Sequence, residues 1–283
     1  MKVLITGSQG MLASDLARVW SAAGHQVTGM SHAELDITNA DQVTSAMEQI
    51  SPDLLVNTPG IGVDTCELEP EKGFQIHTWA GATVARECEK TGASLVYIST
   101  CGVFGDEVKN YSEYDPVVLK TQYARSKYLG EQAAMAACPR TFVIRPGWLF
   151  GGSPEHQRNF VYQRYLEAKK SPVLRSANDK FGSPTATAEL AEKIMSLVAT
   201  EVYGLYHITN SGRASRYDYV KAIVDAFGLS TTVEPVDSSA YPRPAPVPDC
   251  ESLDNVNLRF LGLSPMSSWQ EAVQRYVAEL SKI

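Results

Sequence analysis

The sequence is poor in the features that mark secreted, membrane and nucleic-acid-binding proteins. Its five cysteines form no Cys-x-x-Cys pair and no zinc spacing, so we expect reduced thiols rather than a disulfide framework. No apolar stretch approaches the roughly 18–20 residues that span a bilayer, and residues 1–6 are too short for the apolar region of a secretory signal. The formal charge of −7 gives no positive surface for nucleic acid or membrane. These absences, with no carboxylate cluster that would hold a metal, predict a cytoplasmic protein without metal, membrane or nucleic-acid partners.

What the sequence does contain is a regular alternation of short β-rich runs and helical patterns. The chain of 283 residues is 44% apolar and 20% charged, enough for one large core or two cooperating lobes. Strands are predicted at residues 3–6, 26–29, 54–57, 94–99, 141–145 and 205–209, and helices at 11–23, 40–49, 71–91, 121–137 and 186–199. This alternation predicts an α/β fold with a doubly wound parallel sheet of the Rossmann type, whose ligands lie at the carboxyl ends of the strands.

The composition changes after Arg145, which suggests a second part of the chain. A loop at 147–153 and a helix at 159–170 are followed by a turn-rich segment at 178–185. Residues 235–249 contain five prolines and cannot form a core helix or a central strand. We therefore expect a dinucleotide-binding domain at 1–146 plus 183–210 and a smaller α+β substrate-binding lobe at 147–182 plus 211–283.

A glycine turn joins the first strand to the first helix and indicates a dinucleotide site. Gly7 allows the tight turn, Gly10 lets the backbone approach a pyrophosphate, and Ala13 permits close helix–strand packing. The pyrophosphate would lie on the free amides at the start of the helix. The candidate cofactor contacts of this loop and of the ends of the next two strands are Gly7, Gln9, Gly10, Met11, Leu12, Ser31, His32, Asp36, Ile37, Asn57, Thr58 and Pro59.

The end of the second strand bears on which nicotinamide binds. An acidic residue there would hold the ribose hydroxyls of NAD, but the sequence reads Gly-Met-Ser31-His32. Ser31 and His32 could accept a 2′-phosphate, so NADP (NADPH) is favoured over NAD, and NAD remains an alternative. Asp36 and Ile37 are expected beside the adenine.

The candidate catalytic residues are Thr100, at the end of an apolar run, and a Tyr123-x-x-x-Lys127 pair that follows it. Residues four apart share a helix face, so the Lys127 ammonium can lie beside the Tyr123 phenol. Lowering a phenol pKa from about 10 to neutrality takes about 4 kcal/mol, which Lys127 together with a positively charged nicotinamide could supply. The same spacing also occurs at Tyr165/Lys169 and Tyr217/Lys221, so spacing alone leaves three candidates.

With these residues in place, the chain resembles the extended short-chain dehydrogenase/reductase family, and within it the dTDP-4-dehydrorhamnose reductases, over nearly its whole length. Asn57 at the end of the third strand belongs to the resemblance. The other matching segments are residues 63–70, 98–104, 145–151, 159–160, 181–185 and 204–208.

The resemblance implies reduction of a 4-keto nucleotide-deoxysugar, and it favours Thr100, Tyr123 and Lys127 as the catalytic set. Tyr123 and Lys127 would also contact the nicotinamide part of the cofactor. Thr100, Cys101, Trp148, Asn159 and Arg216 are the substrate-binding candidates, and Arg158, Arg164, Arg216 and Arg243 are candidates for neutralising the diphosphate. The implied partner is a nucleotide sugar, and a homodimer is compatible with the resemblance.

Several positions depart from the family pattern, mostly where the nicotinamide and sugar would bind. Cys101 and Gly102 stand where the family has Asp then Tyr, His77 where asparagine is usual, and Arg216 where a tryptophan is frequent. The run after Asn57 is shorter, and arginines near Pro248 are missing. The alternatives are a nucleotide-sugar epimerase and a non-catalytic NADP-binding subunit of the methionine adenosyltransferase beta type. A dehydratase would need an acid pair beside Thr100.

Overall fold

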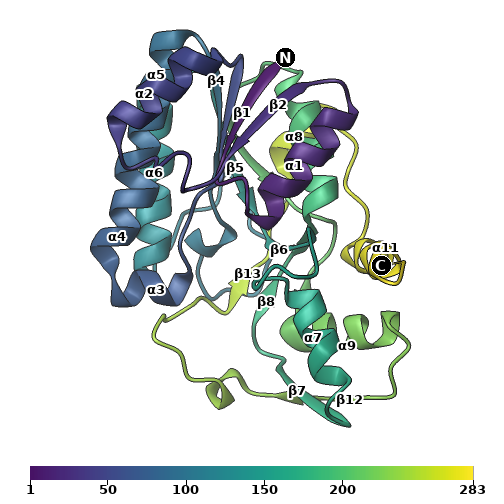
Figure 1. Cartoon of the computed structure of the whole chain (residues 1–283). Coiled ribbons are helices and arrows are strands. Elements are labelled where there is room, and N and C mark those ends of the chain that lie inside the picture. Colours follow the sequence, from purple (N-terminus) through teal and green to yellow (C-terminus); the bar gives the residue numbers. More distant parts are fainter. Residues whose placement is uncertain (283) are drawn as a thin grey trace.

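The computed structural model describes residues 1–282, and its centre is a six-stranded, fully parallel sheet (Figure 1). The strands run in the order β10 (Gly204–Ile208), β5 (Thr141–Pro146), β4 (Ser94–Ile98), β3 (Leu54–Asn57), β1 (Lys2–Thr6) and β2 (Gln26–Met30). The inner strands are buried almost throughout, as expected for a parallel sheet covered on both faces. The predicted α/β class and parallel sheet are confirmed.

Helices cover both faces of this sheet (Figure 1). On one face α1 (Met11–Ala22) packs against α8 (Thr187–Val198), and the indole of Trp20 donates a 2.8 Å hydrogen bond to the Ala191 carbonyl. On the other face lie α2 (Ala40–Ile50), α5 (Ala80–Thr91) and α6 (Gln122–Ala137). Each layer buries its own apolar cluster against the strands, which holds the carboxyl ends of β1, β3 and β4 in fixed positions.

The helix expected over residues 71–91 is interrupted. After α3 (Val63–Leu68), the chain forms α4 (Pro70–Phe74), one π-helical turn (Gln75–Trp79) and then α5. The π turn is held from outside, because Tyr97 donates a 2.8 Å hydrogen bond to the His77 carbonyl and Thr78 donates one of 2.7 Å to the Ser126 carbonyl. Such turns have no periodicity that distinguishes them from an α-helix, and they often occur at functional sites.

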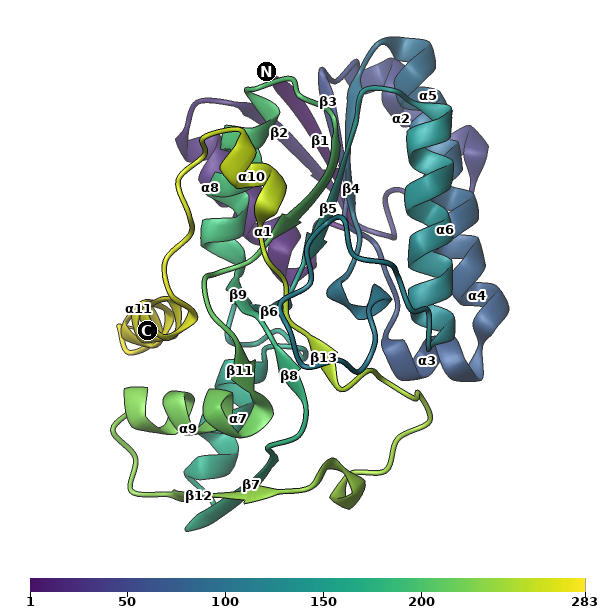
Figure 2. The same ribbon diagram turned by 180° about the vertical axis from the view of Figure 1, so that it is seen from behind.

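The remaining residues form small sheets and helices beyond the carboxyl edge of the main sheet (Figure 1). β6 (Trp148–Phe150) pairs with β9 (Pro184–Ala186), and β7 (Val173–Ala177) with β12 (Thr232–Val236). β8 (Phe181–Gly182) lies between β11 (Ala214–Ser215) and β13 (Cys250–Glu251). The helices are α7 (Phe160–Ala168), α9 (Arg216–Ala226) and α11 (Trp269–Leu280), with a third apolar cluster between them. α10 (Val256–Phe260) instead packs against β10 (Figure 2).

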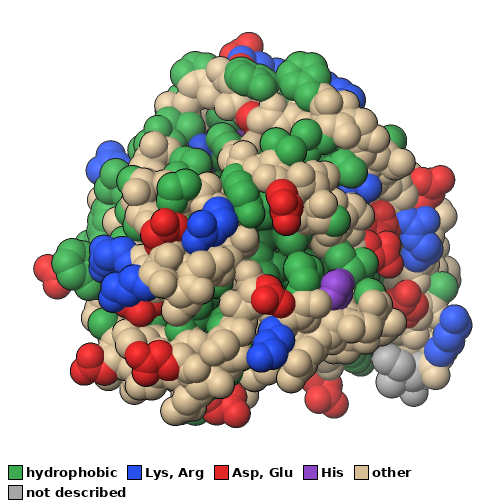
Figure 3. Space-filling view, turned by 90° about the horizontal axis from the view of Figure 1, so that it is seen from above, with side chains coloured by type: hydrophobic (Ala, Val, Ile, Leu, Met, Phe, Trp, Pro, Cys, Tyr) green, Lys and Arg blue, Asp and Glu red, His purple; other side chains and the backbone are tan. Residues whose placement is uncertain are grey.

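Two further observations concern the surface. Acidic and basic side chains are interspersed on the face seen in Figure 3, with apolar side chains between them. Within residues 1–282, the helices are all too short or too polar to cross a bilayer.

Candidate active site

Two cavities lie at the carboxyl edge of the main sheet. The first, of about 1060 Å³, surrounds the glycine turn after β1 and is called the glycine-loop cavity. Gly7 has a φ of +71°, and a Cβ placed on it would lie 3.0 Å from the Thr58 hydroxyl oxygen and 3.1 Å from Pro59 Cγ. Gly10 is the N-cap of α1 and supplies no side-chain cap. The first amides of α1 are therefore open to an anion, and the close approach of the loop to Thr58 and Pro59 requires a glycine.

Most of the predicted cofactor residues line this cavity: Gly7, Gln9, Gly10, Met11, Leu12, His32, Asp36, Ile37, Thr58 and Pro59. Ser31, Asn57, Tyr123 and Lys127 do not. The Ser31 hydroxyl is buried and donates to Glu34 at 2.7 Å, and Asn57 accepts a 2.9 Å hydrogen bond from Thr6 inside the sheet. Both side chains therefore have partners within the protein, and their contact with a cofactor stays a prediction.

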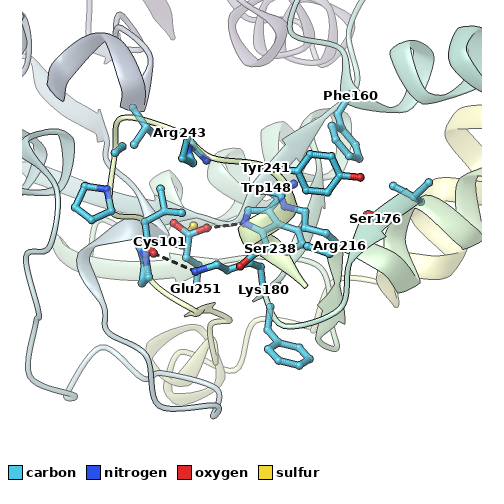
Figure 4. Close-up of a pocket in the computed structure, with 18 of the residues that line it drawn as sticks. Cys101, Trp148, Phe160, Ser176, Lys180, Arg216, Ser238, Tyr241, Arg243 and Glu251 are labelled. Atoms are coloured by element: carbon cyan, nitrogen blue, oxygen red, sulfur yellow. Dashed lines mark hydrogen bonds between the residues drawn. The ribbon is translucent and has the colours of Figure 1, made fainter. Parts of the chain in front are cut away.

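The second cavity, of about 680 Å³, lies between the main sheet and the small sheets and is called the tyrosine cavity. Thr100, Cys101, Trp148 and Arg216, four of the five substrate-binding candidates, line it together with Tyr123. Arg164, Arg175, Lys180 and Arg243 add further positive charge, and Glu251 lies at the wall (Figure 4). Arg158, which was grouped with these arginines, lines the glycine-loop cavity instead.

The three candidate catalytic residues meet where the two cavities approach one another. Thr100 is the last residue before a 3₁₀ turn (Cys101–Val103), and its hydroxyl oxygen accepts a 3.0 Å hydrogen bond from the Gly102 amide. Lys127, one turn after Tyr123 on α6, is buried and donates a 2.9 Å hydrogen bond to the Ile98 carbonyl. Ile98 lines the glycine-loop cavity, while Thr100 and Tyr123 line the tyrosine cavity. The set therefore spans the wall between the cavities.

Burial shifts the pKa values of both Tyr123 and Lys127. Burial raises the pKa of Tyr123, with a smaller opposing effect of the Thr100 hydroxyl and further increases from Cys101, Cys66 and Glu251. Burial also lowers the pKa of Lys127, to about 8, although Glu131 acts in the opposite direction. In the chain by itself, desolvation of both groups dominates. The expected lowering of the Tyr123 pKa involves a positively charged nicotinamide as well as Lys127, and it stays a prediction for the protein with its cofactor bound. Tyr123 is a phenol that stays protonated.

His77 belongs to the site, although it was not among the predicted site residues. The only signal in the sequence was that asparagine is usual at this position in the family. Its Nε2 accepts a 3.2 Å hydrogen bond from the Ile61 amide, so its Nδ1 carries the proton and donates to Ser126 Oγ at 2.8 Å. Ser126 in turn donates to the Tyr123 carbonyl at 2.9 Å. Burial first, and then Lys127, lower the His77 pKa to about 2. A neutral imidazole thus links the loop after β3 to the helix that carries Tyr123 and Lys127.

Trp148 and Arg216 form the far wall of the tyrosine cavity. The Arg216 guanidinium lies 3.4 Å from the centre of the Trp148 ring, and the indole N–H donates a 2.7 Å hydrogen bond to Glu251 Oε2. Figure 4 shows Glu251 between Cys101 and Trp148. Glu251 was missed because it follows the proline-rich segment, more than 100 residues along the chain from Trp148, and a lone glutamate there gives no pattern.

Asn159 was predicted to bind substrate, but it is buried at the start of α7 and does not line the tyrosine cavity. Its side-chain amide donates to the Gly151 and Ser153 carbonyls and to the Tyr276 hydroxyl on α11. Tyr276 donates to the Gly152 carbonyl at 3.0 Å. Asn159 therefore fixes the loop that continues into residues 155–158 of the glycine-loop cavity.

The other two Tyr-x-x-x-Lys pairs lie outside both cavities. The Lys169 ammonium sits over the Tyr165 ring, 5.3 Å from its centre, and Lys221 pairs with Asp225 at 2.7 Å. Neither pair is among the residues that line the tyrosine cavity or the glycine-loop cavity.

The chain has a parallel sheet with a glycine-loop cavity at its first strand and a Thr/Tyr/Lys set at the second cavity. These features define the class of extended short-chain dehydrogenases/reductases. The family model described as the RmlD substrate binding domain matches residues 1–282. The chain belongs to that family.

Relatives with established names match over nearly the whole chain. The spore coat polysaccharide biosynthesis protein SpsK of Bacillus subtilis is 33% identical, covering 99% of this chain and 98% of its own. The dTDP-4-dehydrorhamnose reductase of Mycolicibacterium smegmatis is 33% identical over 98% of this chain and 85% of its own. The crystal structure of the dTDP-4-dehydrorhamnose reductase of Bacillus anthracis in complex with NADP has a TM-score of 0.94 and 31% identity, and the match covers 98% of this chain and 99% of that chain.

Proposed function

We propose that this protein is an NADPH-dependent reductase of a 4-keto nucleotide-deoxysugar, of the dTDP-4-dehydrorhamnose reductase type. One observation carries the proposal: Thr100 and Tyr123 line the tyrosine cavity, while Lys127 is bound to Ile98 at the wall of the glycine-loop cavity. A carbonyl in the first cavity and a nicotinamide in the second would then meet at this wall. The family membership supports the same reaction.

The residues of the glycine-loop cavity fit a dinucleotide with a 2′-phosphate. Gly7 and Gly10 would receive the pyrophosphate on the backbone, and His32 and Arg158 line the same cavity as candidates for the additional phosphate. The Bacillus anthracis relative binds NADP, which also favours NADPH here. When bound, the reduced nicotinamide supplies the hydride.

The protein's own groups supply orientation and the proton. The Thr100 oxygen accepts from the Gly102 amide, which fixes its position, and its hydroxyl would donate to the substrate carbonyl oxygen. Tyr123, whose raised pKa keeps it protonated, donates its proton to that oxygen as the charge develops. Lys127, with a pKa of about 8, holds the nicotinamide ribose and can return a proton to Tyr123.

The tyrosine cavity also fits the nucleotide part of such a substrate. Its lining includes five Arg and Lys residues although the chain carries a net charge of −7. Four of these cations form ion pairs with acidic side chains: Arg175, Lys180 and Arg243 at 2.5–3.4 Å, and Arg164 with Glu167. Arg216 instead lies on the Trp148 ring. We assign Arg216 to the diphosphate, and the segments 147–182 and 211–283, which supply most of this lining, to a substrate-binding lobe.

Single-turnover kinetics on Tyr123→Phe test the proposal. Enzyme loaded with NADPH is mixed with dTDP-4-keto-6-deoxy sugar, and loss of the NADPH absorbance is followed. We expect NADPH binding to change less than about twofold and hydride transfer to fall by about 10²–10⁴-fold, the usual contribution of general acid catalysis. Tyr165→Phe, outside both cavities, is the matched control. Unchanged hydride transfer in Tyr123→Phe would reject the assignment.

A further inference from the structure

Two side-chain oxygens, one of them from the catalytic threonine, come close to the backbone at Gly102. A Cβ placed on Gly102 would lie 3.4 Å from Thr100 Oγ1 and 3.1 Å from Glu251 Oε1. The φ of Gly102 is not in the left-handed region, so the backbone alone does not require glycine here. Thr100 and Glu251 both line the tyrosine cavity. The two oxygens therefore lie near one another at the wall of this cavity, within reach of neighbouring substituents of a single sugar ring.

The Glu251 carboxylate is held in place by one of its two oxygens. Oε2 accepts the 2.7 Å hydrogen bond from the Trp148 indole, and Trp148 lies flat against the backbone of β8, where a Cβ on Gly182 would come within 2.2 Å of its ring. Within residues 1–282, no hydrogen bond to Oε1 is present. A carboxylate oxygen accepts more than one hydrogen bond, so Oε1 can receive a donor from a ligand.

The charges around Glu251 favour a neutral donor. The Arg216 guanidinium stacks on the same Trp148 ring and interacts favourably with the carboxylate. An ammonium group beside Oε1 would face this positive charge, whereas a hydroxyl would gain a charge-assisted hydrogen bond without that repulsion.

We propose that Glu251 Oε1 is a specificity-determining acceptor for the hydroxyl on the sugar carbon next to the carbonyl. This inference rests on the proposed function and concerns only which 4-keto sugar the site prefers. Thr100 would take the carbonyl oxygen, and Glu251 the hydroxyl beside it. Glycine at position 102 allows Thr100 Oγ1 and Glu251 Oε1 to come this close to the backbone.

The test compares two nucleotide-linked 4-keto-6-deoxyhexoses, one with the hydroxyl at C3 and one without it. Wild type, Glu251→Gln and Gly102→Ala are assayed for kcat/KM with both compounds. In Glu251→Gln the amide oxygen can still accept from Trp148, but the group that replaces Oε1 is a donor. Gly102→Ala places a methyl group 3.1 Å from Glu251 Oε1 and 3.4 Å from Thr100 Oγ1, so that the two oxygens must shift. Glu192→Gln, at the surface of α8, is the control.

We expect wild type to prefer the hydroxylated sugar by at least about tenfold, the effect of one hydrogen bond to a charged group. Glu251→Gln should lose about tenfold on that sugar and less than about twofold on the 3-deoxy sugar. Gly102→Ala, whose methyl group also contacts Thr100, should lose activity on both sugars but more on the hydroxylated one. Equal losses on both sugars, or no preference in wild type, would overturn the inference. A wild type that reduces neither compound would instead reject the proposed function.

Discussion

Replacing Lys127 by methionine should stabilise the protein at neutral pH while removing its activity. Burial lowers the Lys127 pKa from 10.5 to about 8, which corresponds to about 3 kcal/mol of unfavourable free energy for the charged form in the folded state. Methionine also loses the 2.9 Å hydrogen bond to the Ile98 carbonyl, worth about 1–2 kcal/mol. The net expectation is a gain of about 1–2 kcal/mol in unfolding free energy at pH 6.5.

The gain in unfolding free energy of Lys127→Met over wild type should become smaller as the pH rises. Between pH 8 and about 10.4 the unfolded chain keeps the lysine proton and the folded chain does not, so wild-type stability rises with pH by up to about 1.4 kcal/mol per unit relative to Lys127→Met. Urea unfolding of cofactor-free protein at pH 6.5, 8 and 9.5 measures this difference. The control is Lys193→Met, since Lys193 also donates to a carbonyl, that of Ser264 at 2.7 Å, but at the surface. If Lys127→Met is less stable than wild type at pH 6.5, or if the difference does not change with pH, the reasoning fails.

Three further substitutions test other contacts. His77→Ala removes the link between Ile61 and Ser126 and should lower kcat by about tenfold in steady-state assays. His77→Asn should retain more activity, and equal activities of the two variants would contradict the positioning role of His77. Glu131→Ala leaves buried Arg145 without its two hydrogen bonds of 2.6–2.8 Å. The free energy of unfolding, measured by denaturation, should fall by about 3–5 kcal/mol. A fall of less than about 1 kcal/mol would count against a stabilising role of this pair. Gly7→Ala should weaken NADPH binding by about tenfold or more in a fluorescence titration, because its Cβ would meet Thr58 and Pro59. Gly24→Ala is the control, because Gly24 also has a positive φ, of +87°, but open space around it. Similar affinities of the two variants would refute the close-approach argument.

Much of the fold could be predicted because its signals are local. Short apolar runs, followed by helical spacing, indicate a parallel sheet wherever they alternate, and the glycine turn marks its first junction. The π turn at Gln75–Trp79 could not be predicted, since its cause is tertiary: Tyr97 binds the His77 carbonyl from a neighbouring strand.

The site was predictable to the extent that residue type implies chemistry. Thr100, Tyr123 and Lys127 carry groups with specific acid–base properties, and they come together at the wall between the cavities. Asn57 and Asn159 were selected for their polar side chains, yet both satisfy buried backbone or side-chain groups. Polar residues at element ends serve either purpose, and only the surrounding contacts decide which. Glu251 illustrates the converse, because its partner Trp148 is distant in sequence.

The hydrogen bonds between Tyr276, Gly152 and Asn159 bear on the order in which the protein can be assembled. The turn at Gly7 leaves the ribosome first, and it begins the cavity that residues 155–158 complete. Those residues are held in part by α11, which is synthesised more than 100 residues later. A nascent chain can therefore form its first βαβ units early, but the contacts of Tyr276 with Gly152 and Asn159 can form only once α11 has emerged.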